Sequence, residues 1–148
     1  MIEAAFMWSV LAESGTRIPL MNDLIWVGLG GLLGANARFI LTRGITHRFP
    51  AWFDGSTIQP TILVNVSGSF LLASFIAWAS RQAEMPEAMR AFLAIGFLGS
   101  FTTFSSFSLE LIQLQLDRGW WLTLLSAILH NGVCIAAALL GWRLFAAR

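Results

Sequence analysis

The residues best suited to chemistry lie in one run, from Gly96 to Glu110. Between Ser100 and Ser108, six of the nine residues are Ser or Thr and the other three are phenylalanines. Hydroxyls satisfy backbone groups that a break in a helix releases, and they donate to an anion that has lost its water. Gly96 and Gly99 permit the dihedral angles of such a break. The run predicts a polar track beside a discontinuity, with hydroxyls that bond back to their own helix as the alternative.

Two aromatic residues of this run have the spacing of a shared surface. Phe104 and Phe107 are three residues apart and so lie on one face of a helix. An aromatic ring is positive at its edge, so an anion could pass between two ring edges without meeting a fixed cation. An ordinary apolar core is the competing interpretation. Glu110 ends the run, where a carboxylate could be a boundary residue, a gate or a proton carrier.

Polar residues also occur within two other apolar stretches. Thr61 and Asn65 are four residues apart and share a helical face, and the Asn amide offers two donors to an anion. A hydrogen bond that only joins two helices is an equally good interpretation of Asn65. His130 and Cys134 share a face of the last apolar stretch. A purely structural histidine remains the alternative there.

The composition indicates that lipid surrounds these residues. Of 148 residues, 57% are hydrophobic and 11% are charged, and the mean hydropathy is +0.72. About 20 apolar residues in a helix cross the hydrocarbon of a bilayer. Four stretches lack Asp, Glu, Lys and Arg: Leu24 to Ala37, Gly55 to Ser80, Ala91 to Leu109, and Gly119 to Trp142. The first of these charge-free stretches reaches the spanning length only if its helix continues past Arg38.

We therefore predict an all-α polytopic membrane protein with four transmembrane helices, at about 22–46, 57–80, 86–115 and 118–145. The short connections favour an up-and-down bundle, which forms one domain over 22–148. The third stretch is longer than the hydrocarbon is thick, so we expect it to be broken near mid-membrane or tilted. Residues 1–21 form an extension, as an interfacial amphipathic helix or a tail.

Several classes of protein are disfavoured. The net charge is +1 and lysine is absent, so nucleic acid is not an expected partner. The sequence shows no Ser/His/Asp set, paired carboxylates or metal-ligand cluster, so we do not expect an enzyme. A proton-coupled antiporter for an ionic solute is the strongest rival of a channel. Such a transporter would be expected to hold an acidic residue deep in a span, and Glu110 is the one candidate.

The distribution of the arginines gives only a weak bias for the orientation of the chain in the membrane. Orientation follows the Lys/Arg bias of short flanking segments, and here the two sides differ by one or two arginines. Both orientations should then occur, which predicts dual topology. One side receives Arg17, Arg81, Arg90, Arg143 and Arg148, and the other receives Arg43, Arg48 and Arg118, joined by Arg38 if it reaches the boundary.

From about Leu24 to Gly141 the chain resembles the fluoride channel family of small four-helix membrane proteins, also called camphor-resistance proteins. Three blocks carry the resemblance: Gly31 to Arg38 (GLLGANAR), Thr61 to Gly68 (TILVNVSG) and Gly96 to Glu110 (GFLGSFTTFSSFSLE). The third block is highly specific for the family, and the other two would be weak signals alone.

The resemblance implies an antiparallel homodimer in the bacterial inner membrane that exports fluoride passively from the cytoplasm. It also implies two pores built from both subunits and a structural sodium ion at the dimer centre. Relatives often carry serine where Cys134 stands and a hydroxyl residue where Ala138 stands. These two departures weaken the expectation that the fourth helix contributes to the pore. The implied roles are the pore for Phe104, Phe107 and Asn65, the polar track for Thr103, Ser105, Ser106 and Ser108, backbone carbonyls on sodium for Gly99 and Thr102, and the vestibule for Arg38. By their positions in the sequence we add Thr61, His130 and Cys134 to the pore and Glu110 to the vestibule.

Overall fold

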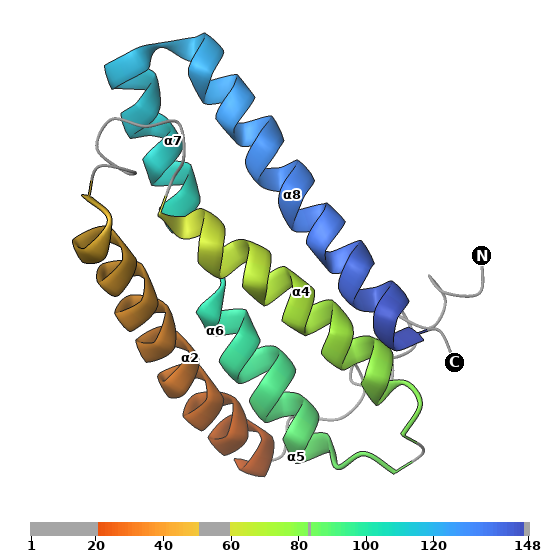
Figure 1. The fold of residues 1–148 in the computed structure, drawn as a ribbon. Coiled ribbons are helices and arrows are strands. Elements are labelled where there is room, and N and C mark those ends of the chain that lie inside the picture. The colour runs from red at the N-terminus through yellow and green to blue at the C-terminus, as the bar shows by residue number, and fades with distance from the viewer. Residues whose placement is uncertain (1–20, 51–59, 83, 147–148) are drawn as a thin grey trace.

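The computed structural model describes residues 21–50, 60–82 and 84–146, and over these ranges the chain is helical and contains no strand (Figure 1). Four helical segments are long and apolar enough to cross a membrane, which confirms the predicted number of spans. The extension predicted over residues 1–21 lies outside the described residues, apart from Met21. The four segments are Asn22–Arg48, Thr61–Ala79, Glu87–Arg118 and Trp120–Ala146.

The helix bounds differ from the predicted ones by one to four residues. The first span is α2 (Met21–Arg48), the second is α4 (Thr61–Ala79) and the fourth is α8 (Trp120–Ala146). The second was predicted from residue 57, and residues 57–59 lie outside the described part. The third consists of α5 (Glu87–Arg90), the π-helix η2 (Ala91–Leu98), α6 (Gly99–Phe101) and α7 (Phe104–Arg118).

A single glycine turns the chain between the third and fourth spans. The third span was predicted to end near residue 115, but α7 continues to Arg118. Gly119 then has φ 84°, a left-handed conformation that glycine adopts without the clash of a Cβ atom. Its N–H donates to the Gln115 carbonyl at 2.9 Å, and α8 begins at the next residue. The helix therefore ends where the turn residue stands.

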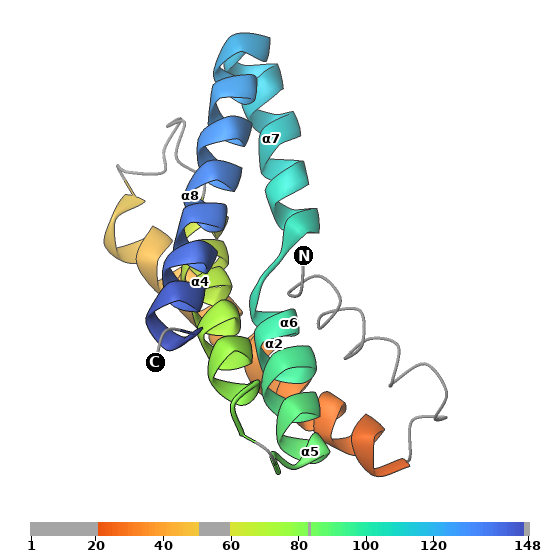
Figure 2. The same ribbon diagram turned by 90° about the vertical axis from the view of Figure 1, so that its right-hand side faces the viewer.

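The two halves of the third span pack against different helices. The first half, from α5 to α6, lies along α2, whereas α7 lies beside α8. Figures 1 and 2 show the chain changing partners between α6 and α7, next to α4. The point where the partners change is also where the helix is interrupted.

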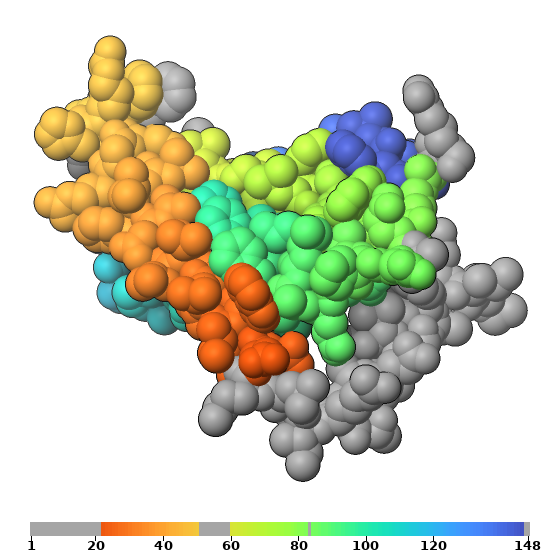
Figure 3. Space-filling model, turned by 90° about the horizontal axis from the view of Figure 1, so that it is seen from below, coloured from red at the N-terminus to blue at the C-terminus, as the bar shows by residue number. Residues whose placement is uncertain are grey.

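Glycines bring α2 close to the first half of the third span. A Cβ atom on Gly30 would overlap the Phe92 carbonyl oxygen, and one on Gly34 would overlap the Phe97 carbonyl oxygen. On the other side, a Cβ on Gly96 would lie 2.7 Å from the Val27 carbonyl oxygen. Seen from below, α2 and the first half of the third span form one continuous surface (Figure 3). Small residues thus serve helix packing here, as their clustering predicts.

Apolar side chains cover the outside of the bundle. The buried core contains few large residues, and Val64 is the largest side chain that is fully buried among the described residues. Leucines, isoleucines and aromatic residues of all four spans are exposed, as at Ile40 and Ile128. Such a surface is unfavourable in water and suited to lipid or to a second protein. The fold is that of a multi-pass membrane protein.

Candidate functional site

The helix of the third span is interrupted at two threonines. Thr102 (φ −83°, ψ 158°) and Thr103 (φ −152°, ψ 118°) have extended backbones between α6 and α7. The Thr103 hydroxyl caps α7, because it accepts a hydrogen bond from the Ser106 N–H at 3.2 Å. The sequence can therefore restart a helix immediately after the interruption.

Asn65 of α4 binds the interrupted backbone from the side. The Thr103 N–H donates to Asn65 Oδ1 at 2.8 Å, and Asn65 Nδ2 donates to the Thr103 carbonyl at 3.0 Å. An Asn amide presents an adjacent donor and acceptor, as a neighbouring strand would. This two-bond contact, the Asn65–Thr103 clamp, satisfies both backbone groups of Thr103.

Two carbonyls lose their usual helical donors at the interruption. In a continuous helix the Thr103 N–H would donate to the Gly99 carbonyl, and the Ser106 N–H would donate to the Thr102 carbonyl. Instead the first donor binds Asn65 and the second binds the Thr103 hydroxyl. Gly99 and Thr102 are the two residues whose carbonyls the family resemblance assigns to sodium. Carbonyl oxygens released in this way suit a hard cation.

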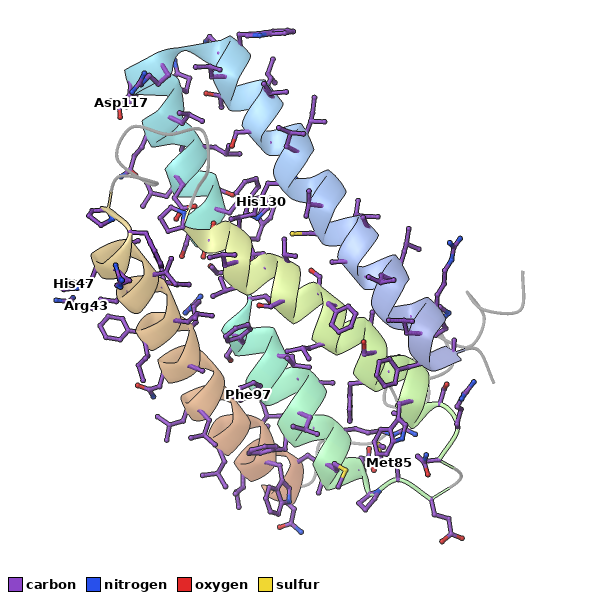
Figure 4. All side chains as sticks on the ribbon, viewed as in Figure 1. Arg43, His47, Met85, Phe97, Asp117 and His130 are labelled. Atoms are coloured by element: carbon purple, nitrogen blue, oxygen red, sulfur yellow. The ribbon has the colours of Figure 1, made fainter. Side chains whose placement is uncertain are left out.

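His130 of α8 completes the cluster around the clamp. Its side chain is buried and lies toward the junction of α4 and α7 (Figure 4). Nε2 is 3.0 Å from Asn65 Nδ2, and the imidazole lies against the Phe107 ring with 4.0 Å between ring centroids. One histidine thus contacts both the amide and one of the two phenylalanines.

The predicted aromatic pair is adjacent but not equally buried. The ring centroids of Phe104 and Phe107 are 5.9 Å apart, with an edge-on arrangement. Phe107 is 3% exposed and faces the interior, whereas Phe104 is 74% exposed. In one copy of the chain the two rings therefore bridge from the polar cluster to the outer surface.

A second polar contact lies one helical turn away on α4. The Thr61 hydroxyl donates to Glu110 Oε2 at 2.5 Å, a short hydrogen bond. Thr61 and Asn65 are four residues apart on α4, and Phe107 and Glu110 are three apart on α7. These residues consequently form a continuous row along the facing surfaces of the two helices.

The remaining hydroxyls divide between the cluster and their own helices. Thr103 Oγ1 is 3.4 Å from the Ser105 hydroxyl and donates to the Ser106 hydroxyl at 3.0 Å. Ser108 donates to the Phe104 carbonyl of its own helix at 2.9 Å, and Thr102 does so to the Leu98 carbonyl at 3.1 Å. The back-bonding alternative therefore describes Ser108 and Thr102.

Two predicted residues lie apart from the cluster within one chain. The Cys134 side chain, one turn beyond His130, lies near Ser69 of α4. Arg38 is half-buried on α2, and Glu110 is on α7. Among the described helices α2 and α7 do not touch, so the two proposed vestibule residues belong to separate parts of the bundle.

The direct contacts of the cluster were not predicted from the sequence. Asn65 and His130 were each candidates, but nothing in a single sequence indicates that their side chains meet. Gly68 was also missed as a site residue. A Cβ at Gly68 would overlap the Thr102 side chain, so this glycine lets the interruption lie directly against α4. A small residue three positions after Asn65 was the available signal.

The fold and these contacts define a helical membrane protein with a polar cluster inside its bundle. A family profile described as "CrcB-like protein, Camphor Resistance (CrcB)" matches residues 25–142. The chain belongs to this family, which confirms the resemblance. A protein of Magnetococcus marinus named "Fluoride-specific ion channel FluC" is 36% identical over 119 residues, which cover 80% of this chain and 94% of the relative. A protein of the same name from Campylobacter jejuni is 35% identical over 126 residues, covering 85% and 99%.

Proposed function

We propose that the protein is a channel of the bacterial cell membrane that lets fluoride leave the cytoplasm passively. The observation that carries this proposal is the meeting of amide, hydroxyl and imidazole groups with two phenylalanines where the third span is interrupted. Hydrogen-bond donors and ring edges are what a small dehydrated anion needs. The names of the curated relatives identify that anion as fluoride.

Fluoride would follow the row of residues shared by α4 and α7. Phe104 and Phe107 present ring edges, and beside them lie the linked hydroxyls of Thr103, Ser105 and Ser106, in which Thr103 donates to Ser106 and the Ser106 hydrogen remains for the anion. Asn65 and Thr61 extend the row on α4, toward the Glu110 carboxylate. The remaining assigned residues are Ser108, His130 and Cys134 as pore residues and Arg38 as a vestibule residue.

Efflux from liposomes tests the channel against the proton-coupled antiporter. Liposomes containing the purified protein are loaded with fluoride at equal pH on both sides, and a potassium ionophore removes the membrane voltage. We expect efflux down the fluoride gradient alone, unchanged by a proton ionophore, and little efflux of chloride. Efflux that requires a proton gradient would instead establish the antiporter.

Aromatic substitutions test the path itself. Phe104→Ile and Phe107→Ile remove the ring edges while keeping apolar side chains, so both should suppress fluoride efflux and leave the dimer intact. Two control variants match them in burial: Phe39→Ile for the exposed ring and Phe101→Ile for the buried one. Target variants that conduct like their controls would remove both phenylalanines from the path.

We further propose that two copies pair antiparallel and form two pores, with the interruption of the third span near mid-membrane. The exposure of Phe104 supports this, because a second copy would cover a ring that one chain leaves outside. An apolar groove of about 470 Å³ between α4 and α8, lined by Leu63, Phe70 and Leu140 among others, is also open to a partner.

Cysteine labelling tests the dual topology. Asp54→Cys in a Cys134→Ser background places one reactive thiol in the connection between the first two spans. Membrane-impermeant reagents should label this thiol from both sides of the cell membrane. Labelling from one side alone would contradict insertion in both orientations.

We also propose a structural sodium ion held by the Gly99 and Thr102 carbonyls of both copies. The released carbonyls described above support this, and a two-fold axis would bring four such oxygens together. Replacing sodium with a large organic cation should lower the thermal stability of the dimer. A dimer that is equally stable and active without sodium would refute the ion's role.

A further inference from the structure

The backbone of Thr103 fixes the orientation of the Asn65 amide. A backbone N–H can only donate and a carbonyl can only accept. The amide atom 2.8 Å from the Thr103 nitrogen must therefore be Oδ1, and the atom 3.0 Å from the Thr103 carbonyl must be Nδ2. Turning the amide over would place two donors and two acceptors against each other. Nδ2 is consequently the atom that faces His130.

This orientation in turn determines the protonation state of His130. Nδ2 carries only hydrogens, so His130 Nε2, 3.0 Å away, must accept. An imidazole accepts at Nε2 only when it is neutral and its proton is on Nδ1. A protonated ring would carry N–H at both nitrogens. Thr103, Asn65 and His130 therefore form a chain of hydrogen bonds that is satisfied by a single tautomer.

We propose that His130 is a proton-sensitive switch of the fluoride path, conducting when neutral and impeding fluoride when protonated. This inference rests on the proposed channel function. A proton on Nε2 turns the contact with Asn65 Nδ2 into two facing donors, which repel each other. The imidazolium remains against the face of Phe107, where a cation is attracted. The contact that breaks is thus the one to the clamp.

Two converging donors next to a positive charge would hold an anion tightly. Conduction requires that an ion binds well enough to enter and weakly enough to leave. With neutral His130, the second donor of Asn65 is engaged by Nε2 and the cluster is satisfied without an anion. With the imidazolium, the Asn65 and His130 donors both become available at the same place. Fluoride then binds there and leaves slowly, so its flux falls in acid.

Few other groups near His130 can take up a proton. Among the described helices α8 packs against α4 and α7, and α4 carries no charged residue. Phe107 is the residue of α7 whose ring lies against His130, and Glu110 follows it by one helical turn. The Glu110 side chain binds Thr61 of α4. Asp117 and Arg118 lie in the last turn of α7. The charged or titratable side chains of these helices are Glu110, Asp117, Arg118, Cys134, His130 and Arg143.

Fluoride efflux at a series of pH values tests the switch. The pH is equal on both sides of the liposomes and runs from about 8 to about 5, the range in which imidazoles titrate. Protein-free liposomes at each pH measure the leak of hydrogen fluoride, which is subtracted. Below the midpoint each pH unit should lower the flux by about tenfold, because the neutral fraction falls by that factor. Flux that is independent of pH after subtraction would overturn the proposal.

Three variants assign the effect to a residue. His130→Gln keeps an acceptor for Asn65 but does not titrate, so its flux should not depend on pH. His47→Gln removes the other histidine of the chain, which is exposed at the end of α2, and should retain the full dependence. Glu110→Gln should likewise retain the pH dependence in whatever flux it has. Loss of the dependence in Glu110→Gln, or its persistence in His130→Gln, would overturn the assignment.

A measurement without transport separates the switch from the channel function. Protein labelled with ¹⁵N-histidine in the His47→Gln background has one imidazole, so its nitrogen resonances belong to His130. We expect the Nδ1–H tautomer at about pH 8 and conversion to imidazolium in acid. The Nε2–H tautomer, or an imidazole unchanged down to about pH 5, would refute the switch. Absence of fluoride flux at every pH would refute the channel function alone.

Discussion

Replacing one atom of the Asn65–Thr103 clamp should disable the interrupted span. Asn65→Asp substitutes an oxygen for Nδ2 and leaves the size of the side chain almost unchanged. The bond from the Thr103 N–H to Oδ1, at 2.8 Å, survives. The 3.0 Å contact of Nδ2 with the Thr103 carbonyl becomes a contact between two acceptors, whereas His130 can carry its proton on Nε2 and donate to the new oxygen. The variant therefore removes donors without creating a cavity.

The loss can be estimated from these contacts. Each hydrogen bond contributes about 1 kcal/mol net, and an unsatisfied carbonyl at Thr103 adds about 1–3 kcal/mol. Asn65 is only half-buried, so water can reach part of the site and the lower end of the range applies. With one hydrogen bond lost and one carbonyl left unsatisfied, we expect about 2 kcal/mol, which lowers the population of the clamped geometry by roughly thirtyfold. If fluoride requires the clamp, its flux falls in proportion.

Asn36→Asp is the matched control for this variant. The Asn36 amide is exposed on α2 and donates at 2.7 Å to the Leu32 carbonyl of its own helix, so it joins no other element. Both variants are compared by thermal unfolding in detergent and by fluoride efflux from liposomes. Asn65→Asp should lose stability and most of its flux, and Asn36→Asp should lose little of either. Equal behaviour of the two variants would refute the argument that the clamp maintains the interruption.

Two further substitutions test contacts elsewhere in the bundle. Gly34→Ala forces α2 away from the backbone of η2 and should cost about 1–3 kcal/mol in thermal unfolding. Gly28→Ala, which meets open space, should stabilise the helix by up to about 1 kcal/mol, and equal effects of the two would contradict the packing. Thr61→Val removes the 2.5 Å bond to Glu110 and should lower fluoride efflux by about tenfold or more. Thr123→Val, whose hydroxyl bonds the Gly119 carbonyl of the turn just before its own helix at 3.0 Å, should leave efflux intact.

The spans could be predicted because charge and length alone determine them. Apolar stretches of more than about 20 residues have few alternatives to crossing a membrane as helices. The end of the third span was misplaced by three residues, since a lone Gly119 gives a weak signal in sequence. The π-helical geometry of η2 was not predicted either. The close packing of α2 against that segment at Gly30 and Gly34 is likewise something that one sequence does not reveal.

The candidate residues could be predicted from the sequence, but the contacts between their side chains could not. Ser and Thr near Gly99 indicate where a helix can be interrupted, because these residue types suit a break. Which side chain binds the released backbone depends on the register of α4 against that segment. Asn65 was predicted to offer both amide donors to an anion, whereas one of them is bound to Thr103 and the other faces His130. Only the three-dimensional packing shows this.

The choice of an asparagine at position 65 follows from what the interruption needs. A serine hydroxyl has one hydrogen and cannot satisfy both the N–H and the carbonyl of Thr103 while also donating to an imidazole. An amide can make all three contacts, so one side chain joins α4 to the interruption and to α8. The same bond to the Thr103 N–H diverts it from the Gly99 carbonyl, which is thereby left without its usual helical donor. We therefore expect changes at Asn65 to affect the proposed sodium site and the His130 contact together.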